Sequence, residues 1–214
     1  MPYRDRLDAG HRLVDPVVSA LERHGLDAAE ALVLGLPRGG VVVAAAVAES
    51  LGSELDVLCV RKLGVPGHEE LAFGALASGG GRVVDSTLVE RVGLGADTVG
   101  AVVARETSEL HRRERAYRGD RPPPRVTGRA VIVVDDGLAT GSTATAACAA
   151  LRAAGADSVM LAVPVAPHGA LDALRPVADP VVCPSTPRFF GAVGQWYDDF
   201  AEVTDDEVRA LLTT

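Results

Sequence analysis

Short apolar runs alternate with helical patterns through most of the sequence. The runs that predict buried strands cover residues 31–36 (ALVLGL), 56–62 (DVLCVRK), 130–135 (AVIVVD), 158–165 and 180–183 (PVVC). Helical patterns over residues 41–52, 97–118 and 142–154 lie between them, with a short helix before the last run. Strands that alternate with helices predict an α/β fold, an open parallel sheet with flanking helices.

Two parts of the chain depart from this alternation. Residues 1–27 predict a peripheral helix, which Pro16 kinks or restarts. Residues 63–81 hold six glycines around one apolar patch and predict a mobile loop followed by a short hairpin. No internal repeat or linker composition interrupts the sequence, so we expect one domain over residues 1–214.

Composition and charge narrow the function classes. Of the 214 residues, 48% are hydrophobic, which excludes a disordered chain. The formal net charge is −8, so the protein as a whole does not attract nucleic acid or an anionic membrane. Cys59, Cys148 and Cys183 are too widely spaced to indicate disulfides or a zinc site. No apolar run resembles a leader or approaches the roughly 18 residues of a membrane span, so we expect a cytoplasmic protein.

The segment VIVVDDGLATGST, residues 131–143, carries the strongest chemical signal. An apolar strand ends in Asp135 and Asp136, passes through a loop of small and hydroxyl residues, and enters a helix whose free N–H groups favour an anion such as phosphate. Two adjacent carboxylates need donors or a cation, and vicinal sugar hydroxyls with Mg²⁺ supply both. The alternative is that the acids only cap the helix or turn. The segment is not a Walker loop, because no lysine follows its glycines.

This segment resembles the phosphoribosyl pyrophosphate (PRPP) fingerprint of the type I phosphoribosyltransferases. The resemblance implies that Asp135 and Asp136 hold the ribose hydroxyls, and that Ala139, Thr140, Gly141, Ser142 and Thr143 cradle the 5′-phosphate. Gly137 departs from the family, which more often has an aliphatic residue or serine there. The resemblance also implies a core over about residues 28–183 and a small hood from the two termini, residues 1–27 and 184–214. It further implies a homodimer, and Mg²⁺ carried by PRPP with no direct protein ligands.

Two further stretches match the family's pyrophosphate contacts. The turn with Arg38, Gly39 and Gly40 follows the first core strand, although a plain strand-to-helix turn is the alternative. Arg61 and Lys62 follow the second core strand, and Lys62 is the only lysine in a chain rich in arginine. We therefore expect Lys62 to act in catalysis with the two acids. The residues after Lys62 lack the lysine and His-Gly of the orotate enzymes, which disfavours orotate as the acceptor.

Five of the eight aromatic residues lie in the last 26 positions. The stretch FFGAVGQWYDDF loosely resembles the hood of the hypoxanthine-guanine enzymes, which makes Phe190, Trp196, Tyr197 and Asp198 candidates for acceptor binding. A hydrophobic cluster that seals the C-terminal segment onto the sheet is the alternative. The tail signature of the uracil enzymes is absent, as are complete HExxH and GxSxG motifs.

The resemblance implies that a nitrogen nucleophile, which we expect to belong to a purine-like base, displaces pyrophosphate from PRPP. Two alternatives stay open. A PRPP-sensing regulator on the same fold would keep the fingerprint but usually adds a nucleic-acid surface, which the acidic balance disfavours. A phosphosugar-binding protein without transferase activity would release no pyrophosphate with any acceptor.

Overall fold

A parallel sheet of five strands forms the centre of the computed structural model, which describes residues 2–213. The strand order is β2–β1–β6–β7–β8, with β1 Leu32–Gly35, β2 Glu54–Val57, β6 Ala130–Val134, β7 Ser158–Ala162 and β8 Val181–Val182. Leu34 pairs with Asp56 on one side and Val133 on the other, so β1 and β6 lie side by side although 94 residues separate them in sequence. The predicted open parallel α/β sheet is confirmed.

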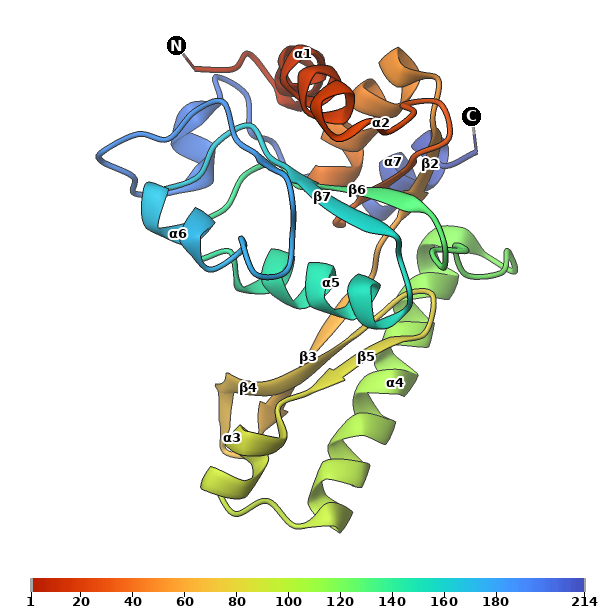
Figure 1. Ribbon diagram of the computed structural model, residues 1–214, viewed down its shortest axis with the longest axis vertical. Helices are drawn as coiled ribbons and strands as arrows, with labels where there is room; N and C mark the ends of the chain where they lie inside the picture. Colours follow the sequence, from red (N-terminus) through yellow and green to blue (C-terminus); the bar gives the residue numbers. More distant parts are fainter. Residues whose placement is uncertain (1, 214) are drawn as a thin grey trace.

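Helices cover both faces of this sheet (Figure 1). Helices α1 (Arg6–His24) and α2 (Gly39–Leu51) pack on one face, where Leu13 and Val17 of α1 are fully buried against Ile132. Helix α5 (Ser142–Ala153) packs on the other face against Val133. The expectation of a peripheral N-terminal helix is therefore wrong. One continuous helix runs through Pro16 and forms part of the core, because its apolar stripe faces the sheet.

A second, antiparallel sheet replaces the loop expected after Lys62. Its order is β3–β4–β5, with β3 Val60–Val65, β4 His68–Ala77 and β5 Gly81–Val84. The strand predicted over residues 56–62 is thus two strands in two sheets, because the chain leaves the parallel sheet at Leu58 and Cys59. The short hairpin is confirmed at Gly79–Gly80, but the mobile loop is wrong, since most of residues 63–81 lie in paired strands.

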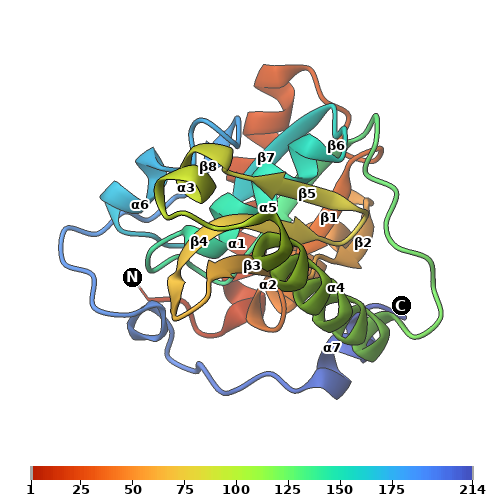
Figure 2. The same ribbon diagram turned by 90° about the horizontal axis from the view of Figure 1, so that it is seen from below.

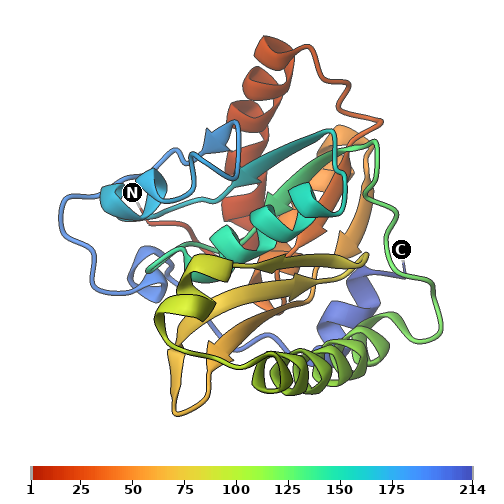
Figure 3. The same cartoon turned by 60° about the horizontal axis from the view of Figure 1, so that its bottom comes forward.

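Helix α5 lies between the two sheets, and α4 (Ala96–Arg118) covers the outer face of the antiparallel one (Figures 2 and 3). Leu110 of α4 packs with Leu63 and Phe73 of that sheet. The short helices α3 (Ser86–Arg91) and α6 (His168–Asp172) lie in connections. The layers place α5 and its N-terminal loop between the sheets.

The two ends of the chain meet at one side of the parallel sheet. Tyr3 pairs with Tyr197, next to the 3₁₀ helix η1 (Val193–Trp196), and the Tyr3 hydroxyl donates to the carbonyl of Pro164 at 2.9 Å. Helix α7 (Asp205–Leu211) then packs against α2 and α4. Within residues 2–213 no helix is long and apolar enough to span a bilayer.

Candidate active site

The two acids stand where β6 ends, at the carboxyl edge of the parallel sheet. The backbone N–H of Asp136 donates to Oδ1 of Asp135 at 2.9 Å. Burial, and then the neighbouring Asp136 carboxylate, raise the pKa of Asp135 well above its ordinary value of 3.8. Burial also raises the pKa of Asp136, and Arg6 opposes that rise. The surroundings therefore favour protonation of Asp135 over protonation of Asp136.

Arg6, which the sequence analysis did not single out, binds the second acid. Its Nε lies 2.8 Å from Oδ2 of Asp136, and the two side chains are only 11% and 16% exposed. Arg6 is the first residue of α1, and Asp136 lies 130 positions later. No local sequence pattern connects the two residues, because an arginine at the start of a helix is expected to be exposed to solvent.

The glycine turn of residues 38–40 lies directly against the acids. A Cβ on Gly39 would fall 1.9 Å from Oδ2 of Asp136, and one on Gly40 would fall 2.9 Å from Oδ1 of Asp135. The Pro37–Arg38 peptide bond in this turn is cis. Only glycine leaves room for the carboxylates here, so the predicted pyrophosphate turn and the predicted ribose acids form one contiguous site.

The loop of residues 137–141 leads from the acids into α5. Gly141 adopts φ +74° at the N-cap of α5 and has no side chain to cap the helix, and the first turn of α5 holds no acid. The Thr140 hydroxyl lies 3.3 Å from the Ser142 hydroxyl, and Ala139, Thr140, Ser142 and Thr143 are exposed. A helix N-terminus with exposed hydroxyls and no acid in its first turn is a suitable environment for a phosphate group.

Lys62 faces this loop from the antiparallel sheet. Lys62, Thr140 and Ser142 line the same cavity of about 550 Å³, which runs between that sheet and α5. Within residues 2–213 the Lys62 ammonium forms no ion pair. Its charge is therefore available to a ligand next to the loop.

Arg61 points the other way, because successive residues of a strand face opposite sides of a sheet. Its guanidinium binds the Glu106 carboxylate of α4 at 2.6 Å, and Glu106 is only 8% exposed. The structure thus separates Arg61 from the acids and the loop. Glu106 occurs at helical spacing between the buried Val102 and Leu110. An acid at such a core-facing position signals that Glu106 needs a buried partner, but the spacing does not identify Arg61 as that partner.

Arg38 is held by the C-terminal segment. It forms an ion pair with Glu202, and its Nη1 lies 3.8 Å from Oδ1 of Asp205 at the start of α7. The Arg38 side chain is 39% exposed, so these pairs are open to solvent. Arg38 lies beside the site, but its guanidinium is paired with Glu202 and Asp205.

The aromatic residues divide into two groups. Tyr197 is buried between the rings of Tyr3 and Phe200, and its hydroxyl donates to the backbone carbonyl of Asp136. Tyr197 thus supports the backbone at Asp136, and its buried ring has no free face on which an acceptor could stack. The half-buried rings of Phe190 and Trp196 stack with centroids 6.5 Å apart.

Two further residues of this segment lie at the surface. The Asp198 side chain is exposed, while its backbone N–H donates to the carbonyl of Tyr3 at 2.8 Å. Phe189, 92% exposed, stands apart from both aromatic groups. The segment therefore combines a sealing cluster with side chains that remain accessible.

Comparison with known proteins identifies the family. A model of the phosphoribosyl transferase domain matches residues 5–200. This chain belongs to the phosphoribosyltransferase family. The recognition made from the fingerprint is confirmed.

Individual relatives agree with this assignment. Two Mycobacterium tuberculosis proteins provisionally named phosphoribosyl transferases, MT0597 and Rv0571c, are each 47% identical over 98% of this chain. The match spans 46% of those relatives' own length. The crystal structure of TT1426 from Thermus thermophilus is 44% identical, covers 99% of this chain and 98% of its own, and superposes with a TM-score of 0.87.

The side chains present fit a metal ion that arrives with phosphates. Within residues 2–213 no group of three or more histidine, cysteine or carboxylate side chains could hold a metal ion. Mg²⁺ usually keeps several waters and binds largely through substrate phosphates, so it does not need a dedicated cage of protein ligands. The site therefore fits an ion that arrives bound to a phosphate-bearing ligand.

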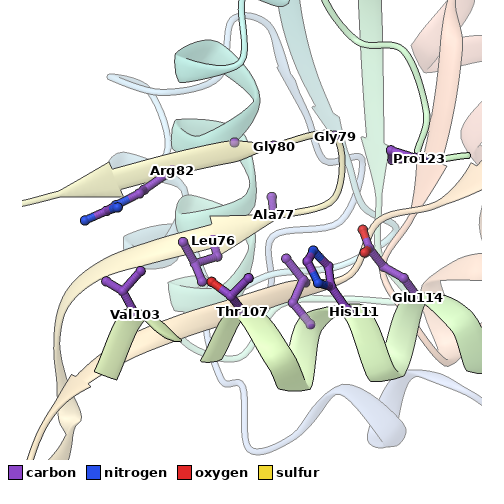
Figure 4. A pocket seen from close by; sticks show the side chains of 12 residues that line it. Leu76, Ala77, Gly79, Gly80, Arg82, Val103, Thr107, His111, Glu114 and Pro123 are labelled. Carbon is purple, nitrogen blue, oxygen red and sulfur yellow. The ribbon is translucent and has the colours of Figure 1, made fainter. Parts of the chain in front are cut away.

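A separate cavity of about 350 Å³ lies between the antiparallel sheet and α4 (Figure 4). Thr107, His111 and Glu114 project from α4 toward β4, and Arg82 stands on β5. None of the predicted site residues lines this cavity. It is a separate space on the far side of the antiparallel sheet from α5.

Proposed function

We propose that this protein transfers the phosphoribosyl group of PRPP to a nitrogen nucleophile, with a purine-like base as the acceptor. The observation that carries the proposal is the contact of the Gly39–Gly40 turn with the Asp135 and Asp136 carboxylates. Turn, acids and hydroxyl loop then share one edge of the sheet, where ligands of open α/β folds bind. Diphosphate, ribose and 5′-phosphate would each meet one of these three parts.

Each acid keeps one oxygen for the sugar. Oδ1 of Asp135 accepts the Asp136 N–H, and Oδ2 of Asp136 accepts from Arg6. In the described part of the chain the other two oxygens accept no hydrogen bond. Two free carboxyl oxygens side by side suit the two vicinal hydroxyls of a ribose.

The reaction forms one bond and breaks one. The nitrogen lone pair of the base forms the new bond to C1 of the ribose, and the C1–O bond breaks with its electron pair leaving on pyrophosphate. The nitrogen then loses its proton to solvent. Positive charge gathers on the ribose as the bond breaks, so the carboxylate of Asp136 stabilises the transition state at short range.

The leaving pyrophosphate needs positive charge and donors. The N–H groups of Gly39 and Gly40, with Arg38 once its acids release it, would bind the diphosphate, and Lys62 would offset the charge that develops. Mg²⁺ carried by PRPP would spread the negative charge of the diphosphate. Arg61 contributes indirectly in this scheme, since Glu106 occupies its guanidinium.

The acceptor side rests on fewer contacts. Phe190 and Trp196 are stacked, half-buried rings, and the exposed Asp198 follows them closely in the chain. Stacking on such rings and a hydrogen bond to the acid would select a planar base with a ring N–H. A homodimeric assembly and a cytoplasmic location stay predictions.

The deciding experiment is pyrophosphate release in the presence of PRPP, Mg²⁺ and a panel of purines, pyrimidines and aromatic acids. We expect release with at least one purine-like base and none without an acceptor. Tight binding of PRPP with no release for any acceptor would contradict the transferase and favour a PRPP-sensing protein. No binding of PRPP would contradict both.

A further inference from the structure

Arg6 is enclosed by three different groups. Besides its bond to Asp136, its Nη1 donates to the carbonyl of Ala201 at 2.7 Å. Its Cζ stands 3.8 Å above the centre of the Phe200 ring. The guanidinium is thus fixed by a carboxylate, a carbonyl and a ring, which use its separate donors and its flat face.

The groups that face Asp136 come from four elements. Asp135 precedes it at the end of β6, Arg6 approaches from α1, and the Tyr197 hydroxyl approaches from the C-terminal segment. The Gly39 backbone of the glycine turn closes the remaining side. Arg6 is the one cation that binds Asp136 within the part of the chain that the structure describes.

We infer that Arg6 is a positioning residue for the reaction: it favours the ionised form of the Asp136 carboxylate and fixes its orientation, with Oδ1 left free for the sugar. This inference rests on the proposed function for its catalytic meaning. The guanidinium also neutralises part of the negative charge that two adjacent acids would otherwise gather. Without it, burial alone would favour a proton on Asp136.

Charge and geometry can be separated by two substitutions. Arg6→Gln removes the charge and keeps a donor, whereas Arg6→Lys keeps the charge but cannot reach the carboxylate and the Ala201 carbonyl with a flat fork. Arg4→Gln removes the same charge two residues earlier, from a side chain 76% exposed. Arg4→Gln is therefore the matched control.

The experiment follows the pH dependence of kcat/KM for PRPP in the wild type and the three variants. An opposite charge at this range lowers a carboxyl pKa by about one to three units. In Arg6→Gln, the pH at which kcat/KM falls on the acidic side of the profile (the acid limb) should therefore rise by that amount. In Arg6→Lys the limb should stay near the wild-type position while kcat/KM falls by about tenfold or more, because the carboxylate is no longer held in place. Arg4→Gln should match the wild type.

A second readout separates this inference from the proposed function. The ¹³C signal of the Asp136 carboxyl, assigned with Asp136→Asn, reports its titration without any substrate. An unchanged titration in Arg6→Gln would overturn the inference even if the enzyme is active. If Arg6→Gln does not fold, Arg6→Lys carries the test, and full wild-type kcat/KM in that variant would overturn the positioning role. Failure of the wild type to release pyrophosphate would contradict only the proposed function.

Discussion

The backbone N–H of Asp136 donates to the Asp135 carboxyl group at 2.9 Å, so the two neighbouring acids have different surroundings. Arg6 binds Asp136 and does not bind Asp135, which is the more deeply buried of the two. Asp136 is thereby favoured to carry the negative charge of the pair. Asp135 is favoured to carry the proton.

This difference predicts a pH-dependent stability. The pKa of Asp135 lies well above 3.8 in the folded protein, so between the unfolded and folded pKa values the folded state binds more protons. The stabilisation is complete below about pH 4 and declines as the pH rises through the folded pKa. Asp135→Asn stays neutral, so its stability should fall less steeply between pH 4 and 8. Urea unfolding without ligand measures this, and Asp120→Asn, an exposed acid after α4, is the control. A wild-type slope in Asp135→Asn would contradict the protonation we assign.

Gly39→Ala tests the contact between the glycine turn and the acids. Its Cβ would stand 1.9 Å from Oδ2 of Asp136 and 2.7 Å from Nε of Arg6, so the ion pair must move. We expect a loss of about 1–3 kcal/mol in the free energy of unfolding, as for other overpacked sites, and weakened PRPP binding. Gly100→Ala, in an exposed turn of α4 with open space around it, should gain about 0.5–1 kcal/mol. Equal effects of the two alanines on stability and PRPP binding would contradict the tight contact.

The apolar pattern predicted the parallel sheet because its strands are buried on both faces and read as continuous apolar runs. The acids and the hydroxyl loop were predictable for a related reason, since the loop chemistry follows one such strand directly. The contacts of Arg6 with Asp136 and of Arg61 with Glu106 were not predictable from local spacing. Each joins elements far apart in sequence, and only the packed layers bring them together.

Release of Arg38 from its acids should strengthen pyrophosphate binding. Exposed ion pairs are worth about 0.2–1 kcal/mol, so the double variant Glu202→Gln, Asp205→Asn should bind inorganic pyrophosphate up to about fivefold more tightly. Isothermal titration measures this affinity directly. Asp206→Asn removes an acid of the same helix turn that pairs with Arg209 instead, and it should leave the affinity unchanged. Weaker binding in the double variant would show that Glu202 and Asp205 support Arg38 rather than compete for it.

Lys62→Ala should lower turnover much more than it weakens PRPP binding. The negative charge on pyrophosphate grows as it leaves, so Lys62 stabilises the transition state more than it stabilises bound PRPP. We therefore expect kcat to fall by about a hundredfold. Single-turnover rates with PRPP affinity measured in parallel separate the two effects. If binding and turnover fell by equal factors, Lys62 would act on a group whose charge stays constant, such as the 5′-phosphate beside Thr140 and Ser142.

Binding of PRPP with Mg²⁺ tests the central claim most directly, because it needs no acceptor. At a hundred times its dissociation constant, a ligand that binds only the folded state adds about 2.7 kcal/mol to the free energy of unfolding. The melting temperature of the wild type should therefore rise clearly with PRPP and Mg²⁺. The rise should be much smaller for Asp136→Asn, which lacks the carboxylate. No rise in the wild type, under conditions where another phosphoribosyltransferase shows one, would contradict the account of this site.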